Sequence, residues 1–113
     1  MIGGYVASAI LAASGLAGVA MPGRVGLALQ TDLATPRSRT EYRVVYGCFA
    51  GVGVFALAAG DTLVFKAVGA LWLGAAAVRL LALALDRPKA DVTWWAFLAL
   101  ELTLGSLGML ASG

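Results

Sequence analysis

Residues 92–111, VTWWAFLALELTLGSLGMLA, form an apolar run with one charged residue, Glu101, near its middle. An α-helix rises about 1.5 Å per residue, so a run of this length crosses the ~30 Å hydrocarbon core of a bilayer. Three further apolar runs of comparable length cover residues 2–21, 41–59 and 62–85. Because helices satisfy all their backbone hydrogen bonds internally, the sequence predicts four transmembrane helices.

The composition supports a membrane protein with a single domain. The chain has 113 residues, of which 61% are hydrophobic and 12% are charged, whereas about one quarter of the residues in a soluble domain are charged. We therefore predict one all-α domain over residues 1–113, an antiparallel bundle of four helices joined by short turns. The longest polar segment, residues 24–40, is expected to be either a loop with a short helix at the membrane interface or a plain loop.

The distribution of Lys and Arg predicts the orientation of the chain. Six basic residues lie in or beside the first and third connections: Arg24, Arg37, Arg39, Arg43, Arg87 and Lys89. The second connection is accompanied only by Lys66. By the positive-inside rule, the first and third connections face the cytoplasm and both termini lie outside it. No basic residue precedes the first apolar run, so we expect a retained helix rather than a cleaved signal peptide.

Small residues at intervals of four predict where the helices approach one another. Gly47 and Gly51 form a GxxxG motif in the second span, and Ala70 and Gly74 share a stripe in the third. Acyl chains are as apolar as leucine, so helices in a bilayer associate through close backbone approach and interhelical hydrogen bonds. We therefore predict that Gly47, Gly51 and Gly74 lie at helix contacts.

Two charged residues lie deep in neighbouring spans. Counted along antiparallel helices, Arg79 lies roughly 10 Å and Glu101 roughly 15 Å from the cytoplasmic ends of their spans. A lone charge at this depth is unfavourable by roughly 2.5–3.5 kcal/mol, and we predict that the two side chains face each other. Arg43 and Tyr46 are expected close by. The cluster is then a fold-specifying ion pair or the lining of a cytoplasm-facing polar pocket; alternatively, Arg79 extends to the head groups and Glu101 is protonated.

The sequence excludes several kinds of chemistry. There is no histidine and only one cysteine, Cys48, so neither metal-ligand spacing nor an intrachain disulfide is present. The basic residues sit at the ends of apolar runs, which is typical of membrane topology and not of nucleic-acid binding. Glu101 is the only candidate base within the spans, so we find no support for an enzyme and expect no catalytic residue and no cofactor.

The second span opens with Glu41-Tyr42-Arg43-Val44-Val45-Tyr46-Gly47-Cys48. This segment resembles the pattern Glu-x-Arg-x-x-Tyr-Gly-Gly of the domain-of-unknown-function 4345 family, with Cys48 in place of the second glycine. The resemblance covers nearly the whole chain. It implies a small bacterial four-helix protein of the inner membrane, distantly similar to the DoxX-like group, and brings no established reaction. It singles out Glu41, Arg43, Tyr46 and Gly47.

We therefore expect an accessory or binding protein whose pocket is formed by Glu41, Arg43, Tyr46, Arg79 and Glu101. The partners we expect are membrane lipids together with a larger membrane complex, a second copy of the chain, or a lipid-like or quinone-like ligand. The alternative function is a small oligomeric transporter or channel with Glu101 as the ion or proton site. A transporter needs polar groups leading to both faces, and the outer half of each span is almost entirely apolar.

Overall fold

The computed structural model describes residues 2–29, 35–88 and 90–112. Its five helices are α1 (Ile2–Ala20), α2 (Pro22–Ala28), α3 (Pro36–Ala59), α4 (Thr62–Leu85) and α5 (Val92–Met109). The described residues contain no strand. All the helices except α2 are long and apolar enough to cross a membrane. The predicted all-α fold with four transmembrane helices is confirmed.

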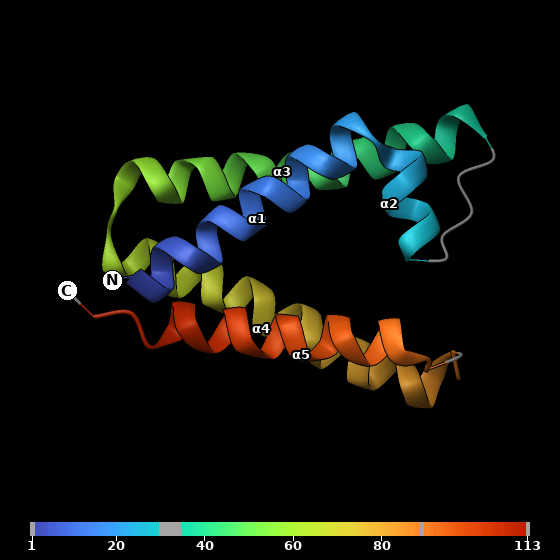
Figure 1. Ribbon diagram of the computed structural model, residues 1–113. Coiled ribbons are helices and arrows are strands. Elements are labelled where there is room, and N and C mark those ends of the chain that lie inside the picture. Colours follow the sequence, from blue (N-terminus) through green and yellow to red (C-terminus); the bar gives the residue numbers. More distant parts are fainter. Residues whose placement is uncertain (1, 30–34, 89, 113) are drawn as a thin grey trace.

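The four long helices form two antiparallel pairs (Figure 1). In one layer α1 packs along α3, and in the other α4 packs along α5. The two layers meet at the end of the molecule that holds both termini, which we call the terminal end, and diverge toward the opposite end, where α2 turns into the space between them. We call this the α2 end. The divergence of the two pairs is the feature that creates a candidate site.

Side-chain caps set the beginnings of the helices. Helix α3 starts at Pro36 rather than near residue 41, because Thr35 has an extended backbone and its hydroxyl accepts a hydrogen bond of 3.0 Å from the backbone N–H of Ser38. Asp61 caps α4 in the same way, accepting from the N–H of Leu63 at 2.8 Å. A threonine before Pro at the first helical position is a strong start signal. It extends the helix into a segment that hydropathy alone marks as polar.

The polar segment between the first two spans contains the expected short helix. Helix α2 begins at Pro22, before Arg24, and ends at Ala28. Residues 36–40 belong to α3 instead of to the connection. Residues 30–34 lie outside the described part of the chain. The chain therefore folds back immediately after α1, which places Arg24 beside the space between the layers.

Glycines bring the helices of each pair into backbone contact, but in the second and third spans they are not the glycines predicted from spacing. A Cβ atom added to Gly53 would lie 2.5 Å from the backbone nitrogen of Ala12 on α1, and one added to Gly69 would lie 2.7 Å from the carbonyl oxygen of Gly105 on α5. A Cβ atom on Gly51 or Gly74 would meet nothing within 4 Å. The prediction that these two residues lie at helix contacts is wrong.

Gly47 is an intermediate case, because an added Cβ atom would meet only the side chain of Val19, at 3.8 Å. That separation is an ordinary van der Waals contact and needs no glycine. A four-residue interval identifies a stripe along a helix but not the direction in which the stripe faces. In this bundle the stripes through Gly51 and Gly74 face outward, and other glycines lie where the helices contact each other.

The two pairs are joined by a packed core at the terminal end. Phe65 and Val68 of α4 are fully buried, as is Ala7 of α1. The ring of Tyr5 packs edge-on against Phe65 with centroids 4.8 Å apart. The indole N–H of Trp72 donates to the carbonyl oxygen of Ala7 at 3.2 Å. This core closes one end of the space between the layers, so any cavity there is open only toward the α2 end or sideways.

Candidate functional site

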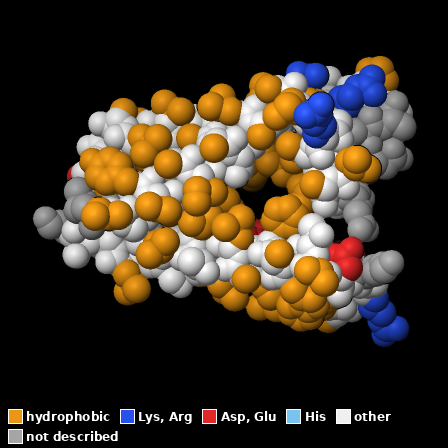
Figure 2. All heavy atoms as spheres, in the orientation of Figure 1, with side chains coloured by type: hydrophobic (Ala, Val, Ile, Leu, Met, Phe, Trp, Pro, Cys, Tyr) orange, Lys and Arg blue, Asp and Glu red, His pale blue; other side chains and the backbone are white. Residues whose placement is uncertain are grey.

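The two helix pairs enclose a cavity of about 660 Å³. Its lining includes Leu11 and Trp72, next to the packed core, and Val25 and Ala28 of α2 at the opposite end. All five helices contribute to its lining. Figure 2 shows the hollow between the two layers, with hydrophobic side chains around it. Its aromatic and charged lining residues are Arg24, Tyr42, Tyr46, Phe49, Trp72, Arg79, Phe97 and Glu101.

Arg79 and Glu101 form an ion pair in the wall of this cavity. The guanidinium donates two hydrogen bonds, Nε to Oε1 at 2.7 Å and Nη2 to Oε2 at 3.0 Å. Glu101 is only 6% exposed. Such a bidentate arrangement is the strongest geometry for an arginine–carboxylate pair. The prediction that the two residues face each other across α4 and α5 is confirmed.

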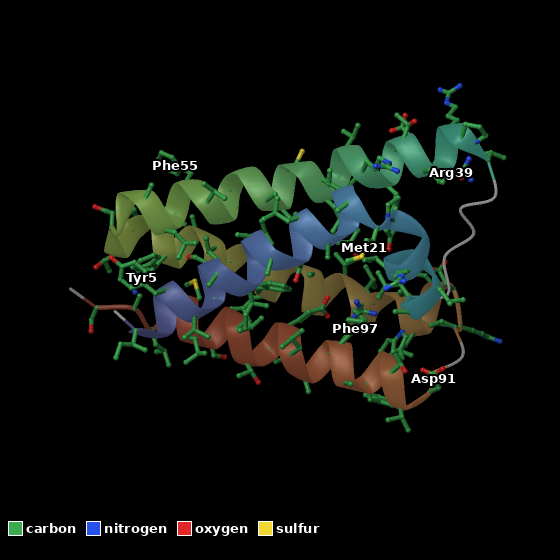
Figure 3. All side chains as sticks on the ribbon, turned by 45° about the horizontal axis from the view of Figure 1, so that its top comes forward. Tyr5, Met21, Arg39, Phe55, Asp91 and Phe97 are labelled. Carbon is green, nitrogen blue, oxygen red and sulfur yellow. The ribbon has the colours of Figure 1, made fainter. Side chains whose placement is uncertain are left out.

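Two aromatic rings hold the guanidinium in place. The Cζ atom of Arg79 lies 5.8 Å from the centroid of the Trp94 ring and 5.6 Å from that of Phe97. Both distances fall within the range of cation–π attraction. Figure 3 shows Phe97 on the side of α5 that faces the other layer, whereas Phe55 points away from the bundle. The rings and Glu101 leave Arg79 little freedom to turn toward the lipid.

The opposite wall is a stripe of aromatic residues on α3. The Tyr42 hydroxyl donates to that of Tyr46 across 3.4 Å, and the ring of Tyr46 packs edge-on against Phe49 with centroids 5.3 Å apart. These three residues and Val45 lie at helical spacing and line the cavity together. Tyr46 therefore lines the cavity.

Arg43 and Glu41 do not join this cluster. Arg43 donates from Nη1 to the carbonyl oxygen of Val19 at 2.7 Å, so it satisfies the C-terminal end of α1. Glu41 is exposed and does not line the cavity. Their predicted place in the pocket is wrong because residues 41 and 43 flank Tyr42 on the helix and point to other faces of α3.

Sequence reasoning missed Arg24, Trp72 and Phe97. Arg24 reaches the cavity because α2 folds back between the layers, and no local pattern predicts that turn. Trp72 and Phe97 belong to apolar runs in which many residues have similar hydropathy. Only the rotation of α4 and α5 about their axes in the structure shows that these two face the cavity. The spacing of Tyr42, Tyr46 and Phe49 is the one signal that could have identified this wall in advance.

A smaller cavity of about 190 Å³ adjoins the larger one at the α2 end. Ala28, Leu29, Arg79 and Phe97 line both. The smaller cavity also touches Asp91, whose carboxylate accepts a hydrogen bond of 3.0 Å from the backbone N–H of Trp94 and caps α5. The site is thus an apolar chamber that becomes polar toward the α2 end.

Comparison with known proteins identifies a family. The family model described as Domain of unknown function (DUF4345) matches residues 2–112, which is nearly the whole chain and agrees with the resemblance carried by residues 41–48. No curated protein matches the chain, and no solved structure does.

Proposed function

The chain belongs to the family described as Domain of unknown function (DUF4345), and because that description assigns no activity, we propose a function from the site: this membrane protein binds one small amphiphilic molecule between its two helix pairs. The cavity between α1, α3, α4 and α5 carries the proposal. Its volume of about 660 Å³ falls in the range of roughly 300–1,000 Å³ that is typical of small-molecule sites.

The lining supports an amphiphile rather than a polar solute. Most lining residues are apolar or aromatic, and the polar groups converge on Arg79 and Glu101. Small-molecule sites in proteins combine these two features, since apolar walls provide affinity and a few fixed polar groups provide orientation. Inside a bilayer such a space would be occupied by an acyl chain or by a ligand of similar character.

The location of the basic residues supports a cavity that opens toward the cytoplasm. Five of the six basic residues that predict the orientation belong to the described part of the chain: Arg24, Arg37, Arg39, Arg43 and Arg87. They lie around the α2 end, where Figure 2 shows Lys and Arg side chains. By the positive-inside rule, this end faces the cytoplasm and both termini lie on the other side of an inner membrane. An accessory role beside a larger membrane complex stays a prediction.

The fluorescence of Trp72 offers a direct test of binding. In a Trp94→Phe/Trp95→Phe background, Trp72 is the remaining indole and lines the cavity. We expect saturable quenching of Trp72 by a single-chain amphiphile brominated along its tail, added to protein in nanodiscs. Ala75→Phe places a ring in the cavity and should weaken binding at least about tenfold, because a filled site leaves no room for the tail.

Ala77→Phe is the matched control for this experiment. Ala77 lies on α4 two residues away, is exposed, and does not line the cavity. Its substitution should leave the quenching curve unchanged. Equal effects of the two variants, or quenching that rises linearly with bulk amphiphile and never saturates, would overturn the proposed binding function.

A flux measurement separates binding from transport. Beyond Trp72, the side chains of Phe65 and Val68 are completely buried, and of the described residues toward the terminal end only Ser8 adds a buried polar side chain. We therefore expect proteoliposomes to show no proton or cation flux above that of empty vesicles. Flux that disappears in Glu101→Gln would contradict this expectation and favour a transporter with Glu101 as its ion site.

A further inference from the structure

We infer that the ligand of the cavity is a single-chain amphiphile with an anionic head group, which Arg24 and Arg79 recognise. The inference rests on the proposed binding function and adds the chemical class of the ligand. It follows from three features of the cavity: its unequal charges, the unused donors of its two arginines, and the direction in which its walls change from apolar to polar.

The charged residues of the larger cavity do not cancel. Its lining contains two cations, Arg24 and Arg79, and one anion, Glu101. Both carboxylate oxygens of Glu101 accept hydrogen bonds from Arg79, so this acid is already neutralised by one of the two cations. Arg24, which is exposed at the edge of the cavity, has no counter-charge in the lining. A ligand that supplies one negative charge would balance the cavity.

Both arginines keep donors that an anion can use. Arg79 binds Glu101 through Nε and Nη2, and its Nη1 has no hydrogen-bond partner within the described residues. Arg24 likewise makes no hydrogen bond or ion pair with any residue that the structure describes. Planar guanidinium groups bind carboxylates and phosphates through paired hydrogen bonds. Glu101 and the two neighbouring rings fix the orientation of Arg79 in advance, which lowers the entropy cost of binding.

The acid of the adjoining cavity, Asp91, lies outside the larger cavity and caps a helix. Asp91 lines only the smaller cavity, and its carboxylate accepts the N–H of Trp94 as the N-cap of α5. The two cations of the larger cavity, Arg24 and Arg79, are the charged groups that an anionic head group there would contact, and Asp91 is not among its lining residues. The apolar stretch beside Leu11, Leu71 and Trp72 then receives the tail.

The volume supports one chain rather than two. About 660 Å³ suits a single small ligand, and the packed core beyond Trp72 prevents the tail from extending to the terminal end. A diacyl lipid could place one chain in the cavity only by leaving the other outside. A free single-chain acid or a lysophospholipid with a phosphate monoester head satisfies both the volume and the charge.

Competition against the brominated probe tests the head group. The competitors share one saturated sixteen-carbon chain: palmitate, lysophosphatidate, the zwitterionic lysophosphatidylcholine and the neutral alcohol hexadecanol. We expect an anionic competitor to bind at least about tenfold more tightly than hexadecanol. This ratio of affinities corresponds to the smallest free energy that a hydrogen bond to a charged group usually contributes. The comparison of palmitate with lysophosphatidate shows whether the preferred anion is a carboxylate or a phosphate.

Arg24→Gln should remove most of this preference and leave hexadecanol binding unchanged, so the neutral competitor also reports that the variant is folded. Arg37→Gln is the matched control, since it makes the same change of charge at the exposed start of α3 and does not line the cavity. If hexadecanol competes as well as palmitate and lysophosphatidate, the head-group inference is wrong and the binding function stands. If no competitor displaces the probe, the binding function itself fails.

Discussion

The Arg79→Leu variant is expected to lose more stability than the double variant Arg79→Leu/Glu101→Leu. Removal of one partner leaves Glu101 buried at 6% exposure without its two hydrogen bonds. Breaking a buried ion pair in this way typically costs about 3–5 kcal/mol, whereas replacing both partners by apolar residues is often close to neutral. Unfolding of purified protein in mixed micelles, followed by far-UV circular dichroism during titration with a denaturing detergent, measures the difference.

Arg37→Leu provides the control for the loss of a positive charge, because Arg37 is exposed at the beginning of α3. Its stability should stay within about 0.5 kcal/mol of the original protein, as is usual for surface substitutions. Equal losses in the single and double variants, or a less stable double variant, would mean that Arg79 and Glu101 are not energetically coupled. The ion pair would then contribute nothing to the specificity of the fold.

A second large effect is expected at the crossing of α1 and α3. In Gly53→Ala, the new Cβ atom would lie 2.5 Å from the nitrogen, 2.7 Å from the Cα and 2.8 Å from the Cβ of Ala12. Backbone atoms cannot move aside like the end of a flexible side chain, so the two helices must separate along their contact. Overpacking of this kind costs about 1–3 kcal/mol. The same unfolding titration detects it.

Gly51→Ala is the matched control on the same helix. Nothing lies within 4 Å of its added Cβ atom, and alanine favours the helical backbone over glycine by about 0.8–1.0 kcal/mol. This variant should therefore be as stable as the original protein or somewhat more stable. If Gly51→Ala were the more damaging of the two, α3 would have to be rotated about its axis relative to its orientation in this structure.

The two pairs of helices also explain why a cavity exists at all. Within each pair, glycines allow close backbone contact, as at Gly53 and Gly69. Between the pairs, the contacts gather at the terminal end around Phe65, and the layers then diverge. No hydrophobic driving force closes such a gap in a bilayer, because acyl chains fill it as well as leucine side chains do. An unfilled space in the core of a soluble protein would be costly, whereas in a bilayer acyl chains are available to fill it.

Hydropathy and the depth of each residue along its span were sufficient to predict much of the fold. The four transmembrane helices follow from the lengths of the apolar runs, and the family follows from the motif of residues 41–48 and the match over residues 2–112. The Arg79–Glu101 contact follows from the cost of burying a charge and from the similar depths of the two residues in antiparallel neighbours. Each of these inferences depends on position along the chain, which the sequence records directly.

The tertiary structure alone decided which way each helix face points. Gly51 and Gly74 face outward although their spacing is typical of helix contacts, and Arg43 binds Val19 instead of joining the ion pair. The return of α2 between the layers placed Arg24 beside the cavity. The rotation of a helix about its axis is set by packing against all its neighbours together, and in lipid no alternation of polar and apolar residues marks the buried face. The sequence therefore determined how deep each residue lies, and only the packed bundle determined what each residue meets.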